Sequence, residues 1–120
     1  MSTPLKMYIF INSDLQMCTG KISSQVGHIV HLIVDEVVRD GFLKRPMSDL
    51  YKNYMIWSKC CTKIVFKATT NQLEELIKLP NARSFTDSGQ TTQNTQNSMT
   101  VVGFFPCNTM NDIIKDYNLL

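Results

Sequence analysis

One stretch of the sequence decides the fold, residues 7–39, which reads MYIFINSDLQMCTGKISSQVGHIVHLIVDEVVR. Met7 to Ile11 is a short, continuously apolar run, which is typical of a strand buried on both faces. A polar loop follows from Asn12 to Gly20. From Lys21 to about Arg39 the stretch predicts a long amphipathic helix, because its apolar residues recur at helical spacing: Ile22, Val26, Ile29, Val30, Ile33, Val34 and Val37.

The rest of the chain continues the alternation of helices and strands. Further helices are predicted to begin at Ser48, at Thr69 (with Gln72 completing a capping box) and at Thr109. Strands are predicted at 63–68, at 99–105 and, very short, at 83–86. The segment 87–98 has no large apolar residue and cannot be a core element. Alternating strands and helices predict an α/β domain with a largely parallel sheet.

Length and charge set broad limits on the class of protein. A chain of 120 residues predicts one domain spanning residues 1–120. The net charge of +2 permits a small phosphate-contacting site without indicating one, because proteins that bind long nucleic-acid surfaces usually carry a denser basic stripe. No apolar run approaches the ~20 residues of a membrane span, and the N-terminus has no export signal, so no membrane partner is expected.

Cysteine usage argues against a metal site. The four cysteines form no Cys-x-x-Cys pair, and no histidine lies at a ligand spacing from any of them: Cys18, Cys60, Cys61 and Cys107. A zinc site is therefore not expected. Four unbridged thiols fit a reducing compartment, and we expect a cytoplasmic protein.

One side of the predicted first helix carries a candidate site. Lys21, Gln25 and His28, at i, i+4 and i+7, fall on one side of the helix, about 130° from the centre of its apolar stripe. They begin at the helix N-terminus, where free N–H groups and a partial positive charge suit a phosphate or a developing oxyanion. Such residues on a polar face are also often only solvated, so spacing alone leaves both interpretations open.

Several motifs together resemble one known family. DLQMCTGKISSQ at 14–25, followed by His28, resembles the Asp-Leu-x-Met-x-x-Gly-Lys-x-Ala-Ala-Gln motif of the archaeal and eukaryotic class of peptidyl-tRNA hydrolases. Asp87-Ser-Gly with its following threonines, and Thr100-Val-Val-Gly, are similar to the Asp-Ala-Gly-x-Thr and Thr-Val-Leu-Gly motifs of that family. The resemblance runs from about Met7 to the C-terminus.

The resemblance implies a fold, an activity and a set of site residues. The fold is a compact α/β domain with a mixed, mostly parallel four-stranded sheet flanked by helices, often a homodimer. The activity is hydrolysis of the ester that joins a peptide to the 3′-terminal ribose of tRNA, with peptidyl-tRNA as partner and with no cofactor or metal. The implied catalytic residues are Lys21, His28, Asp87, Thr92 and Thr100, and the implied substrate-binding residues are Asp14, Gly20, Gln25 and Thr91.

Three points stay open at this level. The family's loop threonine is Thr91 or Thr92, and the general base is Asp87 or His28. Asn12, Gln16 and Gln90 stand at positions that are often basic in the family, which thins the lining that should meet tRNA phosphates. The alternative function is therefore a weak or inactive family member that binds tRNA or a protein.

Overall fold

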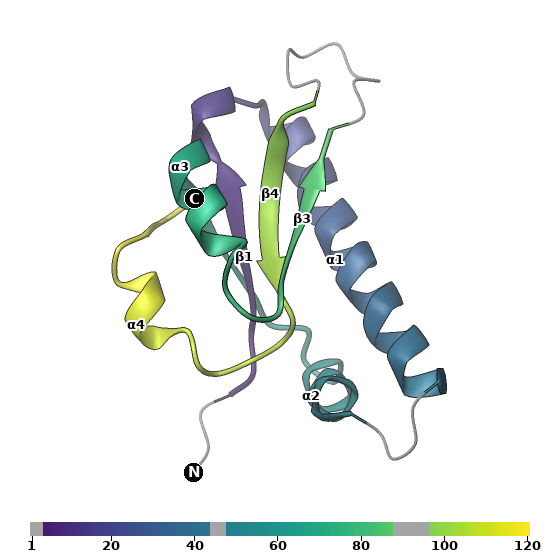
Figure 1. The fold of residues 1–120 in the computed structure, drawn as a ribbon. Helices are drawn as coiled ribbons and strands as arrows, with labels where there is room; N and C mark the ends of the chain where they lie inside the picture. Colours follow the sequence, from purple (N-terminus) through teal and green to yellow (C-terminus); the bar gives the residue numbers. More distant parts are fainter. Residues whose placement is uncertain (1–3, 44–47, 88–96) are drawn as a thin grey trace.

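The computed structural model describes residues 4–43, 48–87 and 97–120 (Figure 1). Its strands lie close to the predicted ranges, and it adds a short C-terminal strand and a 3-10 turn. The elements are β1 (Met7–Asn12), η1 (Ser13–Leu15), α1 (Thr19–Leu43), α2 (Asp49–Trp57), β2 (Lys63–Ala68), α3 (Thr70–Leu76), β3 (Ala82–Thr86), β4 (Met99–Phe104), α4 (Asn111–Ile114) and β5 (Asn118–Leu119).

The sheet is mixed, in the order β3-β4-β1-β2-β5. This confirms an α/β fold with a mixed sheet flanked by helices. The sheet has five strands instead of the predicted four, because β5 pairs with β2 through only two residues, too few to produce a sequence pattern. The mostly parallel arrangement is wrong. Within the described residues only β1 and β2 pair in parallel, and the pairs β1–β4, β2–β5 and β3–β4 are antiparallel.

The direction of β4 explains the error. A parallel neighbour needs a crossover connection, usually a helix, as α1 and α2 provide between β1 and β2. The segment that joins β3 to β4 has no large apolar residue with which a helix could pack on the sheet. β4 therefore returns beside β3 in the opposite direction, and it lies between β3 and β1.

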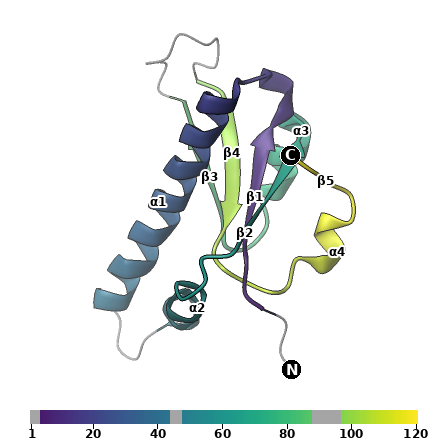
Figure 2. The same ribbon diagram turned by 180° about the vertical axis from the view of Figure 1, so that it is seen from behind.

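Helices cover both faces of the sheet. α1 and α2 pack with Met7, Ile9 and Ile11 of β1 in one buried cluster, and α3 and α4 pack with Tyr8 and Phe10 in the other. Figure 1 and the reverse view in Figure 2 show α1 on one side of the sheet and α3 and α4 on the other. β1 is buried along its whole length, as its apolar run predicts.

α1 packs closely against β4. The helix buries three of its apolar side chains fully against the sheet: Ile29, Ile33 and Val37. Four more are partly buried around them: Ile22, Val26, Val30 and Val34. The close approach is possible because β4 has Gly103 opposite the helix, where an added Cβ would lie 2.7 Å from Ile29 Cγ1. In the described part of the chain no helix, α1 included, combines the length and apolar character of a membrane span.

Two of the three predicted helix starts are confirmed. The side chain of Ser48 accepts a hydrogen bond at the start of α2, and Thr69 with Gln72 forms the capping box of α3. Thr109 is not a cap: α4 begins after Met110, which makes no side-chain cap bond. Met110 is 4% exposed in the cluster under α4, so its burial, and not a polar cap, determines where this single turn starts.

Substituting two glycines should separate close packing from helix propensity. Gly103→Ala should lower the free energy of unfolding by about 1–3 kcal/mol, because the new methyl group overlaps the buried Ile29. Gly27→Ala, in α1 with no atom within 4 Å of an added Cβ, should raise it by about 0.5–1 kcal/mol. Urea denaturation measures both, and equal effects of the two substitutions would contradict the close approach of α1.

Candidate active site

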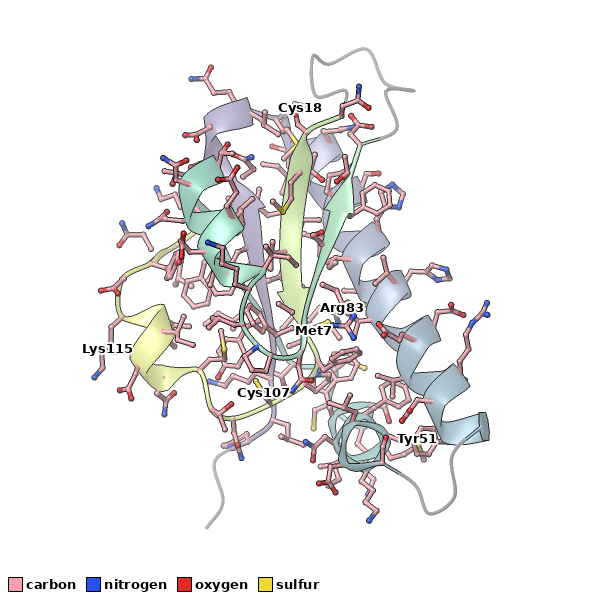
Figure 3. All side chains as sticks on the ribbon, in the orientation of Figure 1. Met7, Cys18, Tyr51, Arg83, Cys107 and Lys115 are labelled. Atoms are coloured by element: carbon pink, nitrogen blue, oxygen red, sulfur yellow. The ribbon has the colours of Figure 1, made fainter. Side chains whose placement is uncertain are left out.

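Ends of several elements meet at one edge of the sheet. β1 and β3 run in the same direction and β4 runs opposite to both, so the last residues of β1 and β3 lie beside the first residues of β4. The chain leaves β1 here and enters α1. In Figure 3, Cys18, which precedes α1, lies at this edge, and Met7 and Tyr51 lie toward the other end of the molecule. Ligands commonly bind at such an edge of an α/β sheet.

A buried ion pair joins α1 to the end of β3. Lys21 Nζ donates a hydrogen bond to Asp87 Oδ2 at 3.0 Å, and the two side chains are 7% and 4% exposed. The backbone of Asp87 is also held, because its N–H donates to the Ser98 carbonyl and its carbonyl accepts from Asn97 N–H. Both charges are removed from bulk water, so their interaction is strong and their positions are well defined.

Arg83 joins β3, the strand that precedes Asp87, to α1. Its guanidinium donates to both carboxylate oxygens of Glu36 on α1, each at 2.8 Å, and lies 4.8 Å from the centre of the Phe105 ring. The hydrogen bond to Glu36 raises the pKa of Arg83. A bidentate guanidinium–carboxylate pair has little orientational freedom. β3, an edge strand, is thereby fixed against α1.

A second buried contact joins α1 to the start of β4. Thr100 Oγ1 lies 2.5 Å from Gln25 Oε1 and 3.2 Å from the Phe85 carbonyl oxygen, and Gln25 and Thr100 are 1% and 0% exposed. A hydroxyl has one proton and cannot donate fully to both oxygens. If the Gln25 amide is turned over, its Nε2 donates to Thr100 and Thr100 donates to Phe85, which satisfies both contacts.

A β-bulge brings Thr100 to this position. The pairing changes from Phe85–Val101 to Thr86–Met99, so one step along β3 corresponds to two along β4. Val101 packs beneath α1, whereas Val102 packs on the opposite face. Strict alternation would place Thr100 on the face of Val102. The bulge instead turns Thr100 toward α1, on the same side as Val101.

Lys21 and Gln25 do not lie on the polar face that the helical spacing predicts for them. They continue the buried ridge Ile29, Ile33 and Val37 at intervals of four residues, toward the helix N-terminus. Residues i and i+4 lie close together around the axis of a helix, so Lys21 and Gln25 lie next to Ile29 on the same ridge. The prediction of a polar face was therefore wrong. At this end of the ridge the neighbours are Asp87 and Thr100, which a polar residue can bond.

The other predicted site residues that the structure describes take no part in these two contacts. His28 is exposed, with Nε2 3.3 Å from Ser24 Oγ and its ring stacked on Phe85. Gly20 is exposed in the first turn of α1. Asp14 accepts a hydrogen bond from Thr70 N–H at 2.8 Å, so its carboxylate lies at the N-terminus of α3. Thr91 and Thr92 lie outside the described residues.

Asn12 connects four elements at this edge. It is 2% exposed, its Nδ2 donates to the Met99 carbonyl and to Thr70 Oγ1, and its Oδ1 accepts from Asp14 N–H. The position that is often basic in the resembled family therefore holds a structural amide here. Only the last contact had a signal in the sequence, since asparagine commonly bonds the backbone two residues on.

The described residues contain no group of three or more histidine, cysteine, aspartate or glutamate side chains that could hold a metal ion. The chemistry of the site is that of a cation, a carboxylate, an amide and a hydroxyl. Beside them is the N-terminus of α1, whose first helical bond runs from Ile22 N–H to the Cys18 carbonyl. The N–H groups of residues 19–21 precede that bond, and such groups favour negative charge.

Comparison with known proteins gives a match at the level of a family. The family model described as peptidyl-tRNA hydrolase PTH2 matches residues 5–120. A comparison with curated proteins gives no match.

The buried ion pair should behave differently from a surface pair. Lys21→Met should lower the free energy of unfolding by about 3–5 kcal/mol, because it leaves the Asp87 carboxylate buried beside an apolar chain. Lys78→Met, which breaks the exposed pair with Glu75, should cost less than ~1 kcal/mol. Adding Asp87→Leu to Lys21→Met should recover much of the loss. Urea denaturation at neutral pH tests all three, and similar costs for the two lysines would contradict the buried pair.

Proposed function

We propose that this chain, which belongs to the peptidyl-tRNA hydrolase PTH2 family, hydrolyses the ester between a peptide and the 3′-terminal ribose of tRNA. The observation that carries the proposal is the buried Lys21–Asp87 pair at the edge of the sheet, beside Gln25 and Thr100. Burying two charges is energetically costly, and this chain buries such a pair at the edge of the sheet where α/β proteins commonly bind ligands.

Ester hydrolysis needs a positioned water, a proton acceptor and stabilisation of the oxyanion. Asp87 is the proposed acceptor: it takes a proton from a water that attacks the ester carbonyl carbon. Lys21 uses one N–H on Asp87 and has two more to donate to the developing oxyanion. The N–H groups at the start of α1 add to this stabilisation.

Collapse of the tetrahedral intermediate then breaks the bond to the ribose oxygen, which takes the proton. The peptide acid then releases its remaining proton to solvent, so the products are a peptide carboxylate, tRNA with a free terminal hydroxyl and one proton. Gln25 and Thr100 are proposed to hold the substrate or the attacking water, since each has hydrogen-bonding capacity at the same edge. This chemistry uses only side chains and backbone. Because peptidyl-tRNA arises at ribosomes, we place the activity in the cytoplasm.

The alternative is a family member that binds tRNA or a protein without turnover. Asn12 and Gln16 stand at positions that are often basic in the family. The side chain of Asn12 is used in hydrogen bonds to Thr70 and to the Met99 carbonyl. The retained Lys21, Asp87 and Thr100 favour an enzyme. The homodimer that the resemblance implies stays a prediction.

Turnover of N-acylated aminoacyl-tRNA tests the activity. The protein should release free tRNA, and Asp87→Asn should lower kcat by ~10²-fold or more, because asparagine keeps most hydrogen bonds but cannot accept the proton. Asp35→Asn is the matched control, since that carboxylate lies exposed on α1 in a pair with Arg39. A chelator should leave the rate unchanged. Turnover by Asp87→Asn equal to that of Asp35→Asn, with both variants folded, would remove Asp87 from the mechanism.

The salt dependence of tRNA binding tests the thin basic lining. Each phosphate contact contributes roughly 0.7–0.9 to the slope of log affinity against log salt, so a slope corresponding to only a few contacts is expected. Gln90→Arg should steepen the slope by about one contact and tighten binding at low salt. Asn111→Arg, on α4, is the control and should have less effect. A steep slope for the unaltered protein would show that the basic surface lies elsewhere.

A further inference from the structure

His28, one of two exposed histidines of α1, has a contact that its expected role as a base does not explain. The rings of His28 and Phe85 are stacked, with centroids 4.6 Å apart and planes inclined by 26°. The imidazole also hydrogen-bonds Ser24, one turn earlier on the same helix. The stacking contact joins α1 to β3, and the contact with Ser24 restrains the imidazole on α1.

Phe85 is directly connected to Thr100. Its carbonyl oxygen lies 3.2 Å from Thr100 Oγ1, and it is the last β3 residue before the register shift. β3 is an edge strand, so β4 alone holds it by strand pairing in the described sheet. At the bulge the strand pairing is locally disrupted. The stacked ring of His28 therefore adds a contact between α1 and β3 at the bulge, beside the ion pairs of Arg83 and Asp87 with α1.

We propose that His28 is a positioning residue, whose ring, stacked on Phe85, holds the end of β3 so that the Phe85 carbonyl orients the Thr100 hydroxyl. Thr100 in turn contacts Gln25 in the proposed site. The inference rests on the proposed function only for its effect on rate. It assigns the imidazole a packing role and leaves proton transfer to Asp87.

Three substitutions separate stacking from proton transfer. His28→Ala removes the ring and should lower kcat by about 10-fold with little change in KM. His28→Phe keeps a stacking ring without a titratable nitrogen, and should stay within about 3-fold of the parent with an unchanged pH profile. Loss of a general base would instead cost both variants ~10²–10⁴-fold. His31→Ala, an exposed histidine one turn along α1, is the control and should match the parent.

A double substitution tests whether His28 acts through Thr100. Thr100→Val keeps the shape of the side chain but removes the hydroxyl that Phe85 orients. In this background His28→Ala should cause no further loss of kcat, because residues that act through one another are not additive. Full additivity of the two losses would overturn the proposal, as would equal large losses in His28→Ala and His28→Phe, or no loss in His28→Ala.

A measurement without substrate keeps the inference separate from the proposed function. The three-bond couplings of the Thr100 γ-methyl group report its χ1 rotamer by NMR. One rotamer is expected in the parent and in His28→Phe, and averaging between rotamers in His28→Ala. If the parent does not hydrolyse the ester, the proposed function fails and these couplings still decide the inference. The same single rotamer in all three proteins would overturn it.

Discussion

The ion pair between Lys21 and Asp87 is the contact on which the arrangement of the candidate site depends. The two residues are 66 positions apart and both are almost fully buried. Pairing offsets part of the cost of burying these charges, because desolvating a single ion costs several kcal/mol. The N-terminus of α1 must therefore lie against the end of β3, and the buried ridge of the helix then follows across β4, where Gly103 admits Ile29.

A second constraint is the direction of β4. Its antiparallel course brings its first residues to the edge where β1 and β3 end, and the bulge at Thr100 turns that side chain toward Gln25. A regular ladder would have sent Thr100 to the opposite face. The hydroxyl thus reaches the site through a local irregularity of the sheet. Asn12 stabilises the same edge by bonding β4, α3 and the turn after β1.

Polar residues at this edge divide into two groups. One group forms two buried side-chain pairs, which combine charge and hydrogen-bonding capacity: Lys21 with Asp87, and Gln25 with Thr100. Asp14 and Asn12 bond the ends of neighbouring elements and support the edge itself. The distinction matters for the proposed activity, because family motifs include both kinds of residue and only their contacts separate them.

The sequence by itself determined the positions of the strands, of α2 and α3 with their caps, and the identity of the motif residues, because capping and periodicity act between near neighbours in the chain. It did not determine the direction of β4, the two-residue β5 or the start of α4. It also placed Lys21 and Gln25 on a polar face. Only the tertiary structure decided these, since the partners that bury Lys21 and Gln25 come from β3 and β4, more than half the chain away. The burial of Lys21 is explained by its ion pair with the Asp87 carboxylate, and the two residues come together only in the folded chain.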